Sequence, residues 1–307
     1  MDPITNHPLY KKHNLDTAIN STWEFYKKYF FVLFGVSLII SLFSQYVSTM
    51  INKEELQSIT DPVQMLQKMT EFIKPFLIIS LVNLYFTTVI VHYIVNKPLN
   101  PGHSIFLSAG KAFIYYIPLL ILMVLLSFFG SIAVIVGVFA LIIGAFFAAL
   151  YILTLYLFIL PVLVVEGTNI SNAITRTFIL AHRRFWQNIG WVSVLLLILI
   201  VISIILSSII MIPFAGDFIK NIFNPGEATS SFASNPVYLV LSALVGAITF
   251  PILPIFSCVL YFNAKASEDE KITIQPVVET EYRPTVEDLY AKPIQEEKKE
   301  EDKKLNE

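Results

Sequence analysis

The sequence predicts an all-α protein: a polytopic membrane helical bundle of six transmembrane helices in three helix pairs, each pair led by an amphipathic interfacial helix. Three observations predict this class. First, 55% of the 307 residues are hydrophobic and only 14% are charged, whereas about 25% of the residues in a soluble domain are charged. Second, the stretch Ile114–Val165 contains no charged residue. Third, a basic segment with aromatic residues occurs twice, each time before a long apolar run.

Six apolar runs are long enough to cross a membrane, because a spanning helix needs about 20 mostly apolar residues. They are residues 29–50, 75–96, 112–130, 132–165, 188–212 and 237–263. The charge-free stretch that ends at Val165 is too long for one crossing at about 1.5 Å per residue, so two helices share it. We place the turn between them at Phe128–Ile132, where Gly130 and Ser131 interrupt the apolar pattern.

The chain divides into an N-terminal cytoplasmic segment (residues 1–13), a membrane domain (14–264) and a charged cytoplasmic tail (265–307). The tail is rich in charged residues and poor in apolar ones. It cannot bury enough surface to offset the entropy lost on ordering, so we expect it to be disordered. The N-terminus lacks the apolar core and cleavage site of a secretory signal peptide. The spans themselves are therefore expected to direct insertion.

Lysine and arginine collect in alternate loops, which predicts the orientation because short cytoplasmic loops carry the excess of these residues. With both termini inside, nine basic residues outside the tail face the cytoplasm and four face the other side. The nine are Lys11, Lys12, Lys27, Lys28, Lys97, Lys111, Arg176, Arg183 and Arg184, and the four are Lys53, Lys68, Lys74 and Lys220. We therefore expect a multi-pass protein of the bacterial cytoplasmic (inner) membrane with cytoplasmic N- and C-termini.

The two basic segments form an internal repeat when Asn14 is aligned with Asn169. Identical pairs are Asn14/Asn169, Ala18/Ala173, Ile19/Ile174 and Thr22/Thr177, and Trp23/Phe178 match in character. Apolar positions spaced by three and four lie on one face of a helix, and asparagine is a good N-cap. A fainter third copy begins at His103. We expect each helix to place its apolar face in the headgroup boundary, anchored by basic and aromatic residues.

The charged residues beside the repeats are the candidate site residues. Lys27, Lys28, Arg176, Arg183 and Arg184 either anchor the topology or contact anionic lipid headgroups or a partner. Glu166 closes the fourth span, ten residues before Arg176. It is either a carboxylate that pairs with an arginine and fixes the turn, or a contact for a headgroup or a partner.

No motif for catalysis or cofactor binding occurs in the sequence. The five histidines form no HExxH pattern, and there is no GxSxG, Walker or GxGxxG motif. The single cysteine, Cys258, lies among apolar residues and is interpreted as a buried inert thiol. Ion-coupled transporters usually have charged residues in the middle of a span. No Asp, Glu, Lys or Arg lies there in this sequence. We therefore expect no enzyme activity, no catalytic residue, no cofactor and no metal.

The segment LPVLVVEGTNISNAITRTFILAHRRFWQNIGWVSVLLLIL, residues 160–199, resembles a family of six-span membrane domains. This family lies N-terminal to some bacterial glycerophosphodiester phosphodiesterases and includes related uncharacterised inner-membrane proteins. The residues that fit its pattern are Pro161, Glu166, Gly167, Ala173, Ile174, Thr177, Phe178, Arg183 and Trp186. The resemblance covers about Asn14–Asn263. The soluble phosphodiesterase barrel has no counterpart in this sequence, so the resemblance implies no catalytic activity.

Three functions remain open at this point. The preferred one is a non-enzymatic membrane protein that acts as an envelope scaffold, a partner-binding subunit or a lipid-handling factor. The alternative is a transporter or lipid-transfer channel, and the third is an intramembrane enzyme. Expected partners are membrane lipids, anionic at the cytoplasmic face, and a membrane-protein partner or a second copy of the chain; no nucleic acid is expected.

Overall fold

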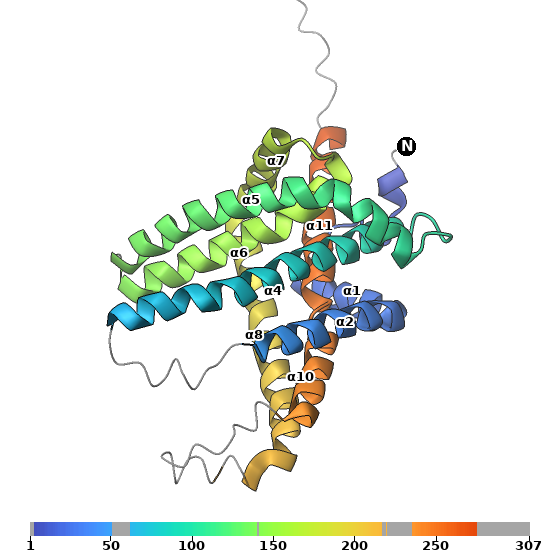
Figure 1. Ribbon diagram of the computed structural model, residues 1–307. Helices are drawn as coiled ribbons and strands as arrows, with labels where there is room; N and C mark the ends of the chain where they lie inside the picture. Colours follow the sequence, from blue (N-terminus) through green and yellow to red (C-terminus); the bar gives the residue numbers. More distant parts are fainter. Residues whose placement is uncertain (1–2, 51–61, 140, 217–218, 220–234, 275–307) are drawn as a thin grey trace, which may run out of the picture. The chain divides into compact units, whose positions relative to one another are not determined.

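The computed structural model describes residues 3–50, 62–139, 141–216, 219 and 235–274, and within them every regular element is helical. The helices are η1 (Pro3–Asn6), α1 (Leu15–Lys28), α2 (Phe30–Ser48), α4 (Pro62–Asn96), α5 (Ile105–Phe139), α6 (Leu141–Glu166), α7 (Ile170–Arg183), α8 (Phe185–Met211), η2 (Ile212–Phe214), α10 (Pro236–Thr249) and α11 (Ile252–Ile274) (Figure 1). Six segments of this described part are long and apolar enough to cross a membrane. The predicted all-α fold with six candidate spans is confirmed, and the chain is a multi-pass membrane protein.

Helices α1 and α7 are separate 14-residue elements that precede the first and fifth spans. The side chains of Asn14 and Asn169 cap their N-termini by accepting hydrogen bonds from backbone N–H groups. Both helices end where the next residue, Tyr29 or Arg184, leaves helical geometry. The aligned positions Ala18/Ala173 and Thr22/Thr177 are buried in both helices, and Trp23/Phe178 are exposed in both.

The segment from His103 does not form a separate leading helix, as had been expected for the third pair. Helix α5 instead runs without interruption from Ile105 to Phe139 and contains Pro118. The two leading helices α1 and α7 end at residues whose backbone angles break the helix, and α5 has no such break. The third span is therefore longer than predicted and includes most of the segment that was expected to be a third copy of the repeat.

The turn expected at Phe128–Ile132 lies elsewhere, because α5 remains helical to Phe139. Gly130 faces α6, where an added Cβ would lie 3.1 Å from the side chain of Ile152. The Ser131 hydroxyl donates to a carbonyl one turn earlier in its own helix, at 2.7 Å. The glycine thus permits close helix packing and the serine is satisfied within the helix, so neither residue ends it.

The sixth span, expected as one helix over 237–263, consists of α10 and α11 with a turn at Phe250 and Pro251. Pro251 has no N–H to donate to the carbonyl four residues earlier, which accounts for the interruption. Helix α11 then continues to Ile274, so the first residues of the segment predicted as a disordered tail are helical. Residues 275–307 of that tail lie outside the described residues.

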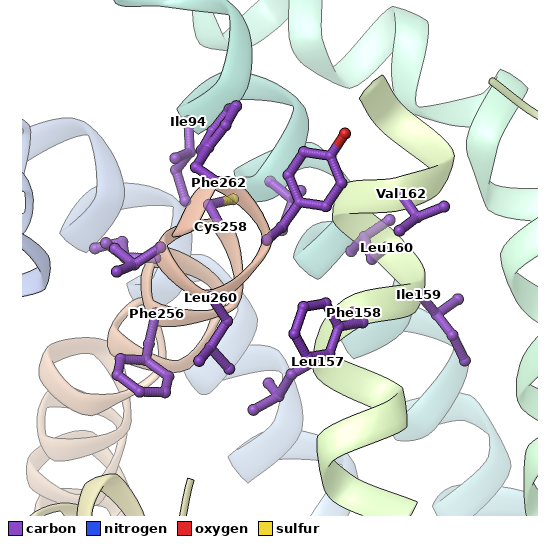
Figure 2. Close-up of a cluster of buried hydrophobic side chains, with 14 of the residues drawn as sticks. Ile94, Leu157, Phe158, Ile159, Leu160, Val162, Phe256, Cys258, Leu260 and Phe262 are labelled. Atoms are coloured by element: carbon purple, nitrogen blue, oxygen red, sulfur yellow. The ribbon is translucent and has the colours of Figure 1, made fainter. Parts of the chain in front are cut away.

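The core forms around α4, α6 and α11. Figure 2 shows side chains of these helices together, among them Ile94, Phe158 and Phe262; all three are fully buried. Helix α5 also packs against α6, α2 against α10, and α6 against α7. The α2–α10 contact is close at Gly246, where a Cβ would lie 2.7 Å from the hydroxyl oxygen of Ser41.

The N-terminal segment packs against the C-terminal end of α4 and the middle of α11 through two buried histidines. The His7 ring stacks on Phe262 with the ring centroids 4.3 Å apart, and its Nε2 lies 3.1 Å from the Ile94 carbonyl oxygen. The backbone N–H of His13 donates to Asn263 Oδ1 at 2.8 Å. Residues 3–13 are therefore part of the packed unit that contains the spans.

Candidate functional site

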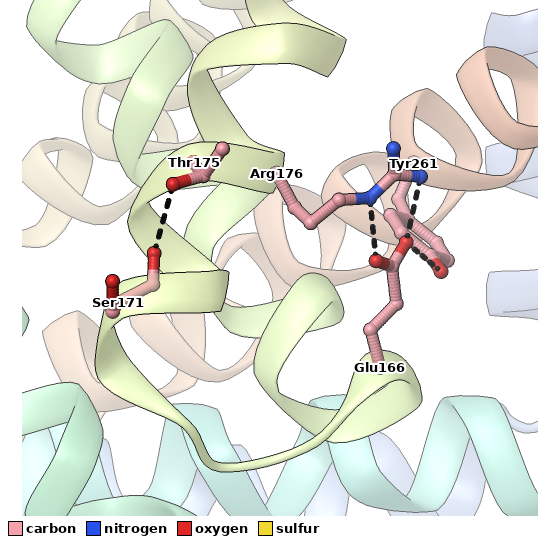
Figure 3. Close-up of polar contacts among 5 residues, drawn as sticks. All are labelled: Glu166, Ser171, Thr175, Arg176 and Tyr261. Atoms are coloured by element: carbon pink, nitrogen blue, oxygen red, sulfur yellow. Dashed lines mark hydrogen bonds and ion pairs between the residues drawn. The ribbon is translucent and has the colours of Figure 1, made fainter.

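Glu166 at the end of α6 pairs with Arg176 of α7 and Tyr261 of α11 (Figure 3). Arg176 Nε and Nη2 donate to the two carboxylate oxygens at 2.6 and 3.2 Å, and the Tyr261 hydroxyl donates to Oε1 at 3.0 Å. Gly167, which follows directly, has a φ of 113°, a region that L-residues rarely adopt. The glycine turns the chain, and the carboxylate joins the three helices.

Of the two interpretations of Glu166, the structure shows the arginine-paired carboxylate. A two-point arginine–carboxylate contact is a strong, directional interaction. Two nitrogens of the Arg176 guanidinium, Nε and Nη2, are therefore engaged with Glu166. Beside it, residues of α6 and α7 line a small polar cavity of 250 Å³ that includes Glu166, Asn172 and Thr175.

The other basic candidates lie at the two junctions between a leading helix and its span. Lys27 and Lys28 form the last turn of α1 and are exposed. Arg183 ends α7, and Arg184 is the residue between α7 and α8, with Nη1 3.5 Å from Gln187 Oε1. Basic side chains in the last turn complement the helix dipole. The structure brings Glu166 and Arg176 together and leaves the other four at these junctions.

A larger, almost wholly apolar pocket lies between α5, α6 and α7, and it was not predicted from the sequence. Its volume is 460 Å³. The lining residues are Leu122, Leu125, Leu126, Phe129, Gly130, Ala133, Tyr151, Ile152, Leu155, Ile159, Ile174, Thr177 and Phe178. The small residues Gly130 and Ala133 of α5 line this space, and the packing of α7 against α5 and α6 encloses it.

Thr177, on the α7 wall of this pocket, has a buried hydroxyl without a hydrogen-bond partner in the described part of the chain. Its side chain is only 2% exposed. Leaving a buried polar group unsatisfied costs about 1–3 kcal/mol. The aligned residue of α1, Thr22, avoids this cost by donating to the Ala18 carbonyl at 2.8 Å.

Tyr151 supplies the second polar group of the pocket wall, and its hydroxyl meets His182 of α7. The His182 Nδ1 lies 2.9 Å from the Phe178 carbonyl oxygen, so in the neutral ring Nδ1 carries the proton and donates. Nε2 is then the acceptor for the Tyr151 hydroxyl at 3.2 Å. This contact ties the rim of the pocket to the C-terminal turn of α7.

A second cavity of 260 Å³ lies beside the turn in the sixth span. Hydroxyl side chains from different helices line it, among them Thr87, Tyr156, Ser203, Thr249 and Ser257. Irregular backbone inside a spanning segment occurs where it is buried in protein or lines a cavity. The interrupted helix therefore borders a space with polar groups and no charged side chain.

A pair of buried histidines lies where α4 gives way to α5. Ser108 Oγ lies 3.1 Å from His92 Nδ1 and 2.8 Å from His103 Nε2. Burial, with Lys111 and Lys97 nearby, lowers the pKa of His103. Within the described residues no group of three or more His, Cys, Asp or Glu side chains is arranged to hold a metal ion.

The fold and its sites define a multi-pass helical membrane protein with an apolar pocket under a leading helix. Neither a family model, nor a curated protein, nor a solved structure matches the chain.

Proposed function

We propose that this is a non-enzymatic lipid-handling protein of the bacterial cytoplasmic membrane, and that the pocket between α5, α6 and α7 takes an acyl chain of a membrane lipid. The observation that carries the proposal is the apolar 460 Å³ pocket between two candidate spans and the leading helix α7. An apolar space that adjoins lipid is filled most readily by a hydrocarbon chain, since every polar ligand would lose its hydration there.

The size of the pocket supports one chain. A cavity of about 150 Å³ holds one benzene molecule, and the pocket is about three times as large, which corresponds to roughly eighteen carbons. Basic residues at the end of α7, Arg183 and Arg184, lie on the element that covers the pocket. They favour an anionic headgroup in the cytoplasmic leaflet, where each basic residue contributes about 1 kcal/mol.

The remaining features are consistent with this assignment. The nine-to-four distribution of basic residues supports cytoplasmic termini. The resemblance of residues 160–199 to the membrane domains associated with glycerophosphodiester phosphodiesterases supports a protein that works beside lipids. We infer that α1 and α7 are copies of one interfacial element, because their capping asparagines and their buried positions coincide.

The experiment is photo-crosslinking of the purified protein in nanodiscs with a phospholipid that carries a diazirine in its acyl chain. Ala133 lines the pocket from α5, and Ala133→Trp should fill it and reduce crosslinking to α6 and α7 several-fold. Val136 lies outside the pocket on the same helix and is exposed, so Val136→Trp is the matched control. Unchanged crosslinking in folded Ala133→Trp would disprove the proposal.

A transporter or lipid-transfer channel remains the second candidate, favoured by the interrupted sixth span. Discontinuous helices beside a cavity form the substrate sites of many secondary transporters, and here hydroxyl groups of Thr249 and Ser257 lie at such a turn. Lipid or solute movement in proteoliposomes would support this function. Lipid retention without movement would leave the first proposal standing alone.

A further inference from the structure

The pocket between α5, α6 and α7 offers a single free hydrogen-bond donor among the described residues that line it. The Tyr151 hydroxyl is directed at His182 Nε2. The Thr177 hydroxyl is buried and donates to no group. All other lining side chains are apolar. The chemistry of the pocket therefore combines a hydrocarbon-sized apolar space with one hydroxyl proton.

The free state of this hydroxyl is unusual for a helical threonine in this protein. Thr22, Thr87 and Thr154 each donate to the carbonyl four residues earlier, at 2.7–2.8 Å. Thr177 makes no such bond. An intrahelical acceptor is the usual partner of a helical threonine; Thr177 lacks one, and an acceptor from outside the chain would satisfy its hydroxyl.

The acceptor must suit an apolar pocket that opens among membrane spans. A phosphate or carboxylate would lose its hydration there without a counter-charge, which is unfavourable. A hydrocarbon or isoprenoid chain has no acceptor. An ester carbonyl at the head of an acyl chain has both properties, since it is neutral and lies where the hydrocarbon meets the headgroup.

We propose that Thr177 donates a hydrogen bond to the ester carbonyl of a glycerolipid whose acyl chain fills this pocket. The inference rests on the proposed lipid-handling function and specifies its ligand class. It makes Thr177 the residue that distinguishes an ester lipid from an ether lipid, while the apolar walls supply affinity for the chain in either case.

The test compares two lipids that differ only in the carbonyl: a diacyl phosphatidylglycerol and its dialkyl ether analogue with equal chains. Retention on the purified full-length protein is measured by native mass spectrometry. The native protein should prefer the ester lipid by roughly fivefold, the contribution of one net hydrogen bond. Thr177→Val, which keeps the shape and removes the hydroxyl, should abolish this preference while the ether lipid still binds. Thr177→Ser should restore it.

Thr22→Val is the matched control, because Thr22 is aligned with Thr177 but its hydroxyl is already satisfied by Ala18; the preference should persist. Equal retention of both lipids by the native protein would overturn the inference even if Thr177→Val failed to fold. An unchanged preference in folded Thr177→Val would also overturn it, and so would full displacement by an equimolar free fatty acid. Unchanged lipid retention in folded Ala133→Trp would instead contradict the proposed function.

Discussion

The Tyr26 hydroxyl donates a hydrogen bond of 2.9 Å to the backbone carbonyl of Ile248, 222 residues further along the chain. Ile248 lies in the last turn of α10, where carbonyls have no intrahelical partner. The leading helix α1 thus donates to a carbonyl in the last turn of α10, just before the interruption at Pro251. Burial raises the pKa of Tyr26 to about 12, so the hydroxyl keeps its proton and remains a donor at every physiological pH.

Tyr26→Phe should destabilise the protein by about 1–2 kcal/mol, because a partly buried carbonyl loses its donor while the ring packing is retained. Thermal unfolding in mild detergent measures the loss. Tyr46→Phe is the control, since Tyr46 is 64% exposed and should change the midpoint little. Equal midpoints for Tyr26→Phe and the native protein would mean that the interrupted helix needs no support from α1.

Glu166 and Arg176 should show a coupling of about 1 kcal/mol in a double-mutant cycle of Glu166→Gln and Arg176→Gln. Both side chains are about one-fifth exposed, at 22% and 23%, and solvent screening keeps the ion pair at this modest value. Unfolding in detergent gives the four free energies. Strict additivity of the two substitutions would show that the pair does not stabilise the α6–α7 turn. A loss of lipid or partner retention at unchanged stability would favour a contact role for Glu166.

Stability should fall as the pH is lowered from about 6.5 to about 4. Burial lowers the pKa of His7 to about 4, and the pKa of His13 and His103 is lowered by burial too. A depressed folded-state pKa means that the neutral histidine contributes its stability above the unfolded pKa of about 6.5 and loses it as the pH falls toward the folded value. Protonated His7 would also lose Nδ1 as the acceptor for the Leu9 N–H.

Unfolding midpoints in detergent at pH 7.5, 6.0 and 4.5 check this dependence. His7→Gln should lower the midpoint at pH 7.5 and flatten the profile, because one titrating group is removed. If His7→Gln kept the full pH slope of the native protein, the docking of the N-terminal segment would not account for it.

Lys27, Lys28, Arg183 and Arg184 should together retain anionic lipid at the junctions of α1 and α7 with their spans. Replacing all four with Gln should weaken anionic-lipid retention strongly, at about 1 kcal/mol for each residue near an anionic surface, and the difference should shrink in high salt. Native mass spectrometry measures the retained lipid. Lys74→Gln, an exposed residue on the expected outer side, is the control. Equal retention of anionic lipid by the fourfold variant and the native protein would show that these residues determine only the topology.

The local sequence pattern predicted the spans, because the mean hydropathy of a stretch of about 20 residues depends only on the residues in that stretch. It also placed α1 and α7, since Asn14 and Asn169 cap helices whose apolar positions recur at three and four residues. The pattern failed where tertiary packing decides. Gly130 suggested a turn, yet α5 continues through it to Phe139, and Gly130 packs against Ile152 of α6.

The sequence indicated a charged pair at the candidate site and gave no sign of the apolar pocket. The ten-residue spacing of Glu166 and Arg176 suggested the pair that the structure contains. The free hydroxyl of Thr177 could not be foreseen, because its aligned partner Thr22 follows the same Ala-Ile pair and has a satisfied hydroxyl. Only the position of α7 over α5 and α6 separates the two.

The excess of basic residues on one side of the membrane predicts the topology of the chain. Single cysteines at Asn20, Asn100 and Glu270, all exposed, should lie in the cytoplasm, and one at Asn235 should lie outside. An impermeant maleimide should label only Asn235→Cys in intact cells and all four after permeabilisation. The native Cys258 is fully buried and should add no background. Labelling of Asn20→Cys in intact cells would show that the orientation is the reverse of the expected one. Thr177 would then contact its lipid in the opposite leaflet.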